Sequence, residues 1–381
     1  MEIDILLNQL DRHNEGNILA TKRFNPNEVI FIYNENEEEL MNSLKKYYDI
    51  YLPQSIFKKM AIKEGDLQSI SKIINKNKNK NIVVNLTGGS RINSLMLLNI
   101  CKNDSIKSIY IDIKNKKLYE FYNNKIEVID ERYEDLELDK LLKASGGEFV
   151  NDSTELSSKE DLILLTKEIY KNLGLWHEYK QKLYESNIFI HNSENSREIK
   201  INLRCLENKE ISLLNKILKK LKDIGGIEYF TASSDEIKVD FKNEYLKSFI
   251  FKSGTWLEVA TNNMINEIKE IDEVKSGVIF LWNDKSKVVR NEVDVIAVKD
   301  SIPICISCKD SDKYNEDALN ELDVYSKQIG GENAYKILVA TKEPIKSAVK
   351  DRAKEMGINL IIFDGNEEKF KNKIKLIISK E

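Results

Sequence analysis

The sequence predicts an α/β fold with two α/β domains on either side of a different middle segment. Over the first 145 residues, short apolar segments alternate with segments of helical character. This alternation is typical of a mostly parallel sheet with helices on both faces. Polar, turn-forming residues follow from 146, and a second alternation of strands and helices begins near 245. We therefore expect three units, residues 1–145, 146–245 and 246–381.

The first unit is expected to alternate strands and helices after an initial strand and a polar loop. The expected strands are apolar runs at 3–7, 28–33, 81–86, 108–113 and 117–122. The expected helices are 36–48, 65–74 and 91–102. The tract NKNKNKN (75–81) is short and polar, and we interpret it as a solvated turn, not as a phosphate-binding patch.

The second unit opens with GGEFVNDSTELSSKED, whose polar and turn-forming residues predict a linker followed by a helix to about 185. The expected elements after it are strands at 188–191 and 199–205, a helix over 207–223 and a hairpin at 227–241. A helix followed by a hairpin is compatible with a winged-helix-like element or with the start of the next domain. The sequence leaves both interpretations open.

The third unit again alternates strands and helices. A helix over 244–268 opens it, and further helices are expected at 314–329 and 342–357. The expected strands are 276–282, 291–298, 302–309, 335–341 and 358–364. We therefore predict a second α/β domain here.

Composition excludes several classes of protein. The 59 basic and 63 acidic residues nearly balance, so bulk positive charge does not hold nucleic acid to this chain, although a local basic cleft remains compatible. Four cysteines in 381 residues are too few for a disulfide framework and suit a reducing cytoplasm. No basic leader follows Met1, and no apolar run approaches the roughly 20 residues of a membrane helix. We expect a cytoplasmic protein without a membrane partner.

Polar pairs on two neighbouring strands of the third unit suggest a hydrolytic site. Glu292 and Asp294 share one strand face, and Ser307 and Lys309 share a face of the next strand. A preceding helix carries Glu258. Carboxylates bind hard divalent cations, which activate water for phosphodiester hydrolysis, while a lysine stabilises developing charge. We predict Glu258 and Asp294 as ligands of Mn²⁺ or Mg²⁺.

The segments GTWLE (254–258), NEVDVI (291–296) and ISCK (306–309) resemble, in this order, the PD-(D/E)xK nuclease superfamily. The resemblance implies a restriction-endonuclease-like domain whose catalytic residues are Glu258, Asp294, position 307 and Lys309. Ser307 departs from the pattern, because most members carry an acid there, and a hydroxyl binds metal more weakly.

Each of these residues also has a structural interpretation. Lys309 alone is compatible with a lysine that reaches solvent from a strand end. Glu258 alone is compatible with a solvated helix face, and Glu292 either supports the metal ligands or lies on the surface. Cys305 and Cys308 are three apart on a strand, so they face opposite sides and do not form a zinc or redox pair.

The first unit contains a glycine turn. NLTGGSRINSL (85–95) places Thr-Gly-Gly-Ser between a buried strand and a helix. Glycines let backbone amides approach an anion, and a helix N-terminus adds partial positive charge. The segment matches neither the ATPase phosphate loop nor the dinucleotide fingerprint. A plain tight turn with Ser90 as helix cap is the alternative.

This turn, ahead of a PD-(D/E)xK domain, resembles the CARF-nuclease effectors of type III CRISPR systems, whose usual run is close to N-x-T-G-G-T-K. The resemblance implies a Rossmann-like CARF domain in a homodimer that binds a cyclic oligoadenylate, most often the tetra-adenylate, and switches on cleavage of DNA, RNA or both. The ligand-binding residues it implies are Asn85, Thr87, Gly88, Gly89, Ser90, Arg91 and, by position only, Asn17.

Two other functions remain as alternatives. One is a ligand-responsive transcription regulator with a degenerate nuclease domain, which the serine at 307 suggests. The other is an unregulated restriction-like or repair nuclease, which leaves the glycine turn unexplained. If the chain is a regulated nuclease, we expect coupling through residues 146–158 and the unit after them.

Overall fold

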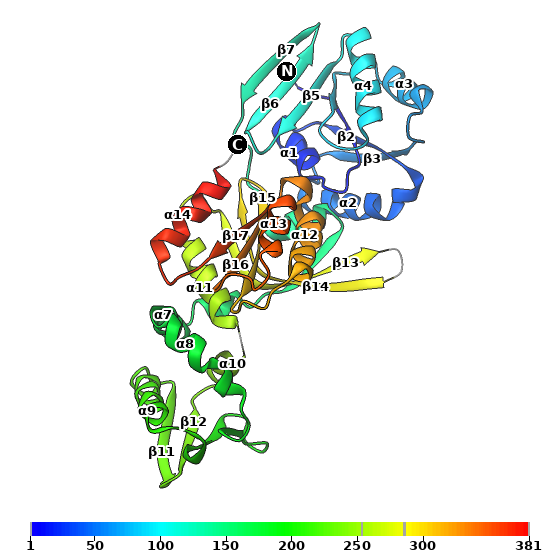
Figure 1. Ribbon diagram of the computed structural model, residues 1–381. Coiled ribbons are helices and arrows are strands. Elements are labelled where there is room, and N and C mark those ends of the chain that lie inside the picture. The colour runs from blue at the N-terminus through cyan, green and yellow to red at the C-terminus, as the bar shows by residue number, and fades with distance from the viewer. Residues whose placement is uncertain (1, 253, 285–286, 380–381) are drawn as a thin grey trace.

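The computed structural model of the protein describes residues 2–252, 254–284 and 287–379. Three units follow one another in space (Figure 1), but not in chain order. The N-terminal domain lies at one end and the unit formed by the middle of the chain at the other. The C-terminal domain lies between them and contacts both.

The N-terminal domain is built on a seven-stranded sheet of order β3-β2-β1-β4-β5-β6-β7. The pairs from β3 to β5 are parallel, and β5-β6-β7 is an antiparallel meander. The strands are β1 (Ile5–Gln9), β2 (Glu28–Tyr33), β3 (Ile56–Ala61), β4 (Ile82–Asn85), β5 (Lys107–Asp112), β6 (Lys117–Tyr122) and β7 (Lys125–Asp130).

Helices cover both faces of this sheet, as predicted. Alternate strand residues point to opposite faces, so Leu6 and Phe31 belong to one core and Ile5 and Ile30 to the other. The first face carries α1 and α2, and the second carries α3 and α4. The helices are α1 (Glu15–Phe24), η1 (Glu35–Glu37), α2 (Glu38–Tyr51), α3 (Leu67–Lys76) and α4 (Arg91–Asn103).

The C-terminal domain contains a six-stranded sheet of order β17-β16-β15-β14-β13-β8. The strands β8, β13, β14 and β15 pair antiparallel, and β15, β16 and β17 pair parallel. The strands are β8 (Gly147–Asn151), β13 (Glu273–Asp284), β14 (Lys287–Lys299), β15 (Ile302–Lys309), β16 (Tyr335–Ala340) and β17 (Ile358–Ile362).

The segment expected to be a linker from residue 146 is therefore only partly a linker. Its first residues form β8, which pairs with β13 at the edge of the C-terminal sheet. Short helix α6 (Thr154–Ser157) and helix α7 (Glu160–Lys171) follow and pack on α11 (Thr255–Asn266) of the same domain. The C-terminal domain thus recruits a strand and helices from the segment that directly follows the N-terminal domain.

Helices also cover both faces of the C-terminal sheet. One face carries α7, α11 and α14, and the other carries α5 and α12. Cys305 lies in the core on the α12 face and Cys308 in the core on the α11 face, which confirms that the two thiols point apart. The helices are α5 (Leu138–Ala144), α6 (Thr154–Ser157), α7 (Glu160–Lys171), α11 (Thr255–Asn266), α12 (Glu316–Gly330), η4 (Gly331–Asn333), α13 (Ala348–Glu355) and α14 (Glu367–Ile378).

The helix expected over 244–268 is two helices. The first, α10 (Glu244–Phe251), belongs to the middle unit, and α11 starts after Gly254, whose φ of +94° is not helical. The helix expected at 342–357 begins only at residue 348, and Pro344 lies in the irregular segment before it.

The middle unit is a four-stranded antiparallel sheet of order β11-β12-β10-β9 with helix α9 beside it. The helix and hairpin expected at 207–241 are both present. Its elements are α8 (Leu173–Tyr179), η2 (Lys180–Tyr184), β9 (Phe189–His191), β10 (Glu198–Asn202), η3 (Leu203–Cys205), α9 (Asn208–Asp223), β11 (Ile227–Ser233) and β12 (Glu236–Phe241).

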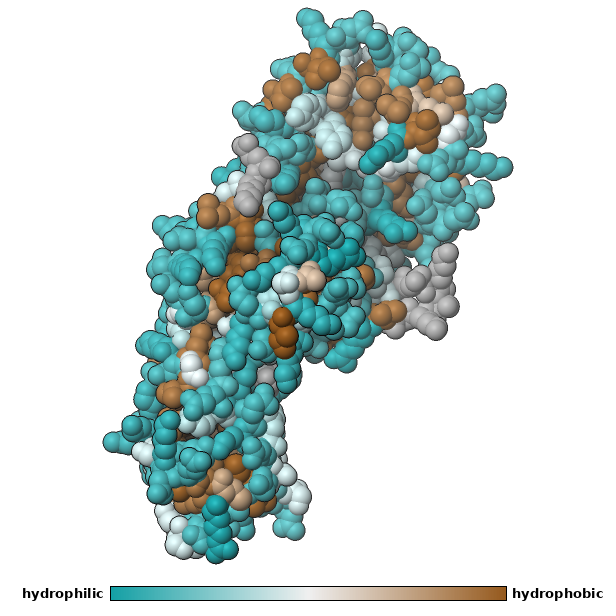
Figure 2. Space-filling model, in the orientation of Figure 1, coloured by the Kyte–Doolittle hydropathy of each residue, from teal (hydrophilic) through white to brown (hydrophobic). Residues whose placement is uncertain are grey.

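The face visible in Figure 2 is mostly hydrophilic on all three units, with scattered apolar patches. Within the described part of the chain, no helix is long and apolar enough to cross a membrane.

Candidate active site

The polar residues of β14 and β15 meet at one carboxylate oxygen. Oδ2 of Asp294 accepts a hydrogen bond from the Cys308 amide at 2.6 Å and from the Ser307 hydroxyl at 3.2 Å. The Lys309 ammonium lies 3.8 Å from the same oxygen. The strand spacing therefore brings together the acid, the hydroxyl and the lysine that the sequence predicted.

Glu258 faces this cluster from the first turn of α11. Its carboxyl group is mostly removed from water, and burial together with the nearby charge of Asp294 raises its pKa to about 7. Glu292 adds to this rise, and it shares a face of β14 with Asp294 although its side chain is exposed. Lys252 and Lys309 act in the opposite direction. The negative charge of Asp294 therefore acts on Glu258, as expected for two acids on the same side of a site.

These residues fit a hard divalent cation such as Mn²⁺ or Mg²⁺. Glu258 and Asp294 offer carboxylate oxygens, and the hydroxyl of Ser307 lies beside Asp294. A cation bound there would lower the pKa of water and offset charge on a phosphate. Ser307 donates to Asp294, so in this arrangement it orients the carboxylate.

A buried carboxylate directly after Lys309 was missed by sequence reasoning. Asp310 accepts hydrogen bonds from the indoles of Trp176 at 2.7 Å and Trp256 at 2.8 Å, and from the Thr341 hydroxyl at 2.9 Å. The Lys180 ammonium lies 3.1 Å away. These donors hold the pKa of Asp310 below its ordinary value despite burial.

Asp310 therefore joins segments that are far apart in sequence. Trp256 lies on α11 two residues before Glu258, while Trp176 and Lys180 come from α8 and η2. The helix that carries the second acid and the strand that carries the lysine are tied to one carboxylate. The sequence around Asp310 did not predict that it joins these segments, because its partners lie far away in the chain.

The glycine turn of the N-terminal domain has the predicted strand–turn–helix geometry. Gly89 has a φ of +82°, and a Cβ there would lie 2.4 Å from Cβ of Gln9. Beneath the turn lie buried side-chain amides of asparagine residues. Asn85 donates to Asn8 at 3.0 Å and to Asn17 at 3.1 Å.

Side chains of the turn differ in what they can reach. Asn85 and Asn17 are buried beneath it, so they shape the turn from below. Thr87 bonds Asn85 at 2.6 Å and accepts from the Ile111 amide at 2.8 Å. Arg91, at the start of α4, is exposed.

The remaining turn residues lie between surface and interior. Ser90 precedes α4 at the N-cap position, but its hydroxyl donates to Glu64 at 2.5 Å instead of capping the helix. Gly88 is buried, and the backbone amide of the next residue, Gly89, donates to the Asp11 carboxylate at 2.6 Å. The anion-binding amide predicted from the glycines is therefore bonded to a carboxylate of the chain itself.

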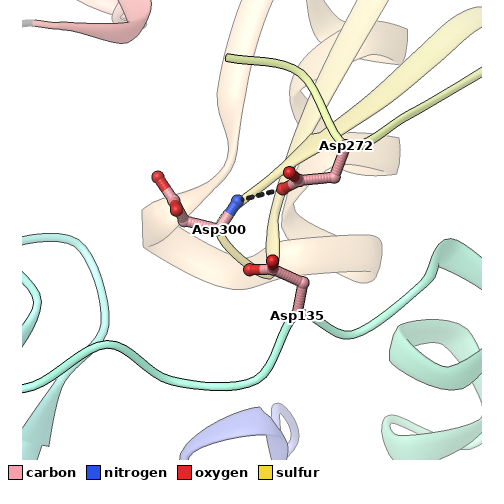
Figure 3. Close-up of side chains that lie close together, drawn as sticks. All are labelled: Asp135, Asp272 and Asp300. Carbon is pink, nitrogen blue, oxygen red and sulfur yellow. Dashed lines mark hydrogen bonds between the residues drawn. The ribbon is translucent and has the colours of Figure 1, made fainter. Parts of the chain in front are cut away.

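A second acidic group lies at the joint between the N-terminal and C-terminal domains (Figure 3). Carboxylate oxygens of Asp135, Asp272 and Asp300 lie within 4.8 Å of one another. The Asp300 amide donates to Asp272 at 2.7 Å, and Lys116 and Lys299 pair with Asp300 at 2.7 and 2.8 Å. Burial and the two other acids raise the pKa of Asp135. Since Lys116 and Lys299 already pair with Asp300, we interpret this acidic group as a contact between domains.

Comparison with known proteins supports both predicted domains. A family model described as Card1 CARF domain matches residues 16–137. A second, described as Card1-like, endonuclease domain, matches residues 245–378. No curated protein matches the chain.

Solved structures share the whole architecture at low sequence identity. Protein VC1899 from Vibrio cholerae has a TM-score of 0.78 and 17% identity, with 98% of this chain and 97% of that chain covered. Can2 from Sulfobacillus thermosulfidooxidans, solved with cyclic tetra-adenylate, has a TM-score of 0.73 and 19% identity, with 99% and 100% covered.

A type III CRISPR defence DNA nuclease activated by cyclic oligoadenylate gives a TM-score of 0.53 at 14% identity. The match covers 92% of this chain but 48% of that one. These likenesses establish the fold, and the two family matches confirm the predicted α/β domains and the predicted nuclease. The chain therefore combines a CARF domain of the Card1 type at residues 16–137 with a Card1-like endonuclease domain at residues 245–378.

Proposed function

We propose that the protein is a metal-dependent endonuclease of type III CRISPR defence. Its activator is a cyclic oligoadenylate, and we propose cyclic tetra-adenylate. The observation that carries the proposal is the meeting of Glu258, Asp294 and Lys309 at one end of the C-terminal sheet, in a chain whose CARF domain offers a glycine turn to an anion. The structural likeness to a protein solved with cyclic tetra-adenylate supports this activator.

In the proposed reaction each residue has a distinct task. Glu258 and Asp294 hold Mn²⁺ or Mg²⁺, which supplies an activated water and charge compensation at the phosphate. Lys309 stabilises charge that develops on the phosphate oxygens or orients the attacking water. Ser307 holds the Asp294 carboxylate in place, and Glu292 adds negative charge from the exposed side.

Regulation requires the ligand to bind the active arrangement better than the resting one. We propose a homodimer in which two glycine turns meet across a two-fold axis, so that repeated phosphates of a ring contact matching amides. In each subunit Gly89 supplies the central amide and Arg91 an exposed cation at the start of α4.

The test is an incubation of the purified protein with plasmid DNA, single-stranded DNA and single-stranded RNA. Each substrate is combined with Mn²⁺ or Mg²⁺, with and without cyclic tetra-adenylate, and Asp294→Ala serves as the inactive control. We expect activator-dependent cleavage of at least one substrate by the unaltered protein alone. Cleavage that ignores the activator, or that persists in the control, contradicts the proposal.

A transcription regulator is the second candidate, and the middle unit favours it, because helix α9 precedes the β11–β12 hairpin. The assembled carboxylates and lysine disfavour it, since a degenerate nuclease has no reason to keep them together. Stable, sequence-specific binding of duplex DNA without cleavage would favour this candidate.

A further inference from the structure

A short loop of the CARF domain, residues 11–14, connects the glycine turn to the endonuclease domain. Its Asp11 carboxylate accepts a hydrogen bond from the Gly89 amide at 2.6 Å with one oxygen and from the His13 amide at 3.1 Å with the other. A Cβ on Gly88 would lie 3.2 Å from Cβ of Asp11, so the loop packs closely on the turn. The negatively charged Asp11 side chain therefore accepts a hydrogen bond from an amide that an anionic ligand would use.

Two further residues hold this loop in place. The Asn14 side chain accepts from the Asp11 amide at 3.1 Å and donates to the Asp11 carbonyl at 2.6 Å. It also donates to the Ala144 carbonyl at the end of α5, at 3.1 Å. Because these bonds join Asp11 to His13 and Asn14, displacement of Asp11 disturbs the contacts of the whole loop.

The other end of the loop contacts the endonuclease domain. The His13 ring lies against Gly331, just after α12, where a Cβ would come within 2.7 Å of its Cδ2. The Lys327 carbonyl, also on α12, lies beside the ring. Burial lowers the pKa of His13, which favours the neutral imidazole in this contact, while Asp11 and Glu332 favour its protonated form and Arg12 opposes it.

Helix α12 leads from this contact to the active site. It directly follows β15, which carries Ser307 and Lys309, and it packs on β15 and on α5. Its buried residues Leu319, Leu322 and Ile329 share one continuous core with the CARF domain. A shift at the end of α12 therefore reaches the strand of the active site through packed side chains.

We propose that Asp11 and His13 form the switch that couples the two domains. In this structure the Asp11 carboxylate accepts the Gly89 amide that a ligand phosphate would use. A cyclic oligoadenylate displaces this carboxylate, the loop moves, and His13 changes its contact with the end of α12. This inference rests on the proposed function and assigns the coupling to residues 11–14, in place of the expected path through residues 146–158.

The first test removes the contact on either side. His13→Ala deletes the imidazole, and Gly331→Ala places a methyl group against it. Gly357→Ala is the matched control. Its φ of +67° is close to the +60° of Gly331, and it also follows a helix of the endonuclease domain, but a Cβ there meets only the Lys336 side chain at 3.9 Å. The readout is the ratio of cleavage rates with and without saturating cyclic tetra-adenylate, alongside direct binding of that ligand.

We expect His13→Ala and Gly331→Ala to bind the ligand but to lower this ratio by about tenfold or more, since coupling between sites is typically about five- to 150-fold. Gly357→Ala should keep the ratio of the unaltered protein. In the His13→Ala background, Gly331→Ala should add little, because both changes act on one contact. An unchanged ratio in folded, ligand-binding His13→Ala overturns the inference.

The second test concerns competition at the amide. Asp11→Asn keeps the shape of the side chain and removes its charge, so the ligand phosphate faces a weaker competitor and less repulsion. We expect cyclic tetra-adenylate to bind about tenfold more tightly, the usual difference for a hydrogen bond to a charged group. Unchanged or weaker binding contradicts the competition. If the unaltered protein itself ignores cyclic tetra-adenylate, the proposed function fails, which is a different result.

Discussion

The endonuclease site and the glycine turn are built from different parts of the chain. The endonuclease site is made mainly of side chains: the Ser307 hydroxyl and the Lys309 ammonium group face one oxygen of Asp294, which the Cys308 backbone amide also holds. The glycine turn offers backbone amides, and several side chains predicted there, such as Asn85 and Asn17, are buried beneath it. Side-chain chemistry is lost by truncation, whereas backbone chemistry is lost only when the path of the chain changes.

The largest effect of this difference is expected at Asp294. Asp294→Ala removes the proposed metal ligand and the partner of Lys309, so activator-stimulated cleavage should fall by about a thousandfold or more. Lys309→Ala should cost about 10²–10³ in rate, the usual loss for one transition-state contact. The measurement is cleavage of a labelled strand across a metal titration. Cleavage at the unaltered rate by both variants would show that the active site lies elsewhere.

The glycine turn should respond to an added Cβ. Gly89→Ala forces an alanine to a φ of +82° and places its Cβ 2.4 Å from Gln9, so the amide moves and the ligand response should disappear. Gly65→Ala is the matched control, because its φ is +74° but its Cβ would meet only the Met96 side chain at 4.0 Å. Basal cleavage should persist in both variants. A normal ligand response in Gly89→Ala would exclude this turn as the ligand site.

The raised pKa of Glu258 predicts a pH effect on metal binding. In the metal-free protein this carboxyl has a pKa of about 7, and a cation competes with its proton. Below that pH the metal concentration for half-maximal cleavage should rise about tenfold per pH unit, and above it the value should level off. Glu258→Gln should bind metal more weakly and lose this dependence. A pH-independent midpoint in the unaltered protein would mean that Glu258 does not bind the metal.

Asp310 should affect stability more than chemistry. Asp310→Asn leaves Lys180, only 8% exposed, without its buried partner, which typically costs about 3–5 kcal/mol in free energy of unfolding. The double variant Asp310→Asn with Lys180→Met should recover part of this loss, since no unpaired charge stays buried. Denaturant unfolding measures both values. Equal stability of the single and double variants would contradict the role of this ion pair.

The smallest effect is expected at Ser307. Its hydroxyl only orients a carboxylate that the Cys308 amide already holds at 2.6 Å, so Ser307→Ala should lower the rate by no more than about fivefold. Ser307→Glu should tighten metal binding by adding a ligand. A loss as large as that of Lys309→Ala would mean that the hydroxyl itself contacts the metal or substrate.

Much of the fold could be predicted because most strands bury one or both faces as apolar runs. Helix α1 was missed because polar Asn17 and Thr21 are among its buried residues, so the sequence shows no continuous apolar face of helical period. Strand β3 was missed because IFKKMA lies at an edge and is largely exposed. Strand β7 was missed for the same reason, because it is also an exposed strand at an edge of the sheet.

The contacts of the candidate site could be predicted where spacing along one strand decides which side chains share a face, as for Ser307 and Lys309. It could not be predicted where distant segments converge. Asp310 draws partners from positions 176, 180, 256 and 341, and no local pattern encodes that meeting. The contact of His13 with Gly331 likewise depends on how two domains pack.

The central claim is that a ligand at the glycine turn controls the site at Asp294. The most direct test is the ratio of cleavage rates with and without cyclic tetra-adenylate at saturating Mn²⁺, measured on one labelled strand for the unaltered protein and for Gly89→Ala. We predict strong stimulation of the unaltered protein and a ratio near one for the variant. Equal ratios in the two proteins would contradict the claim.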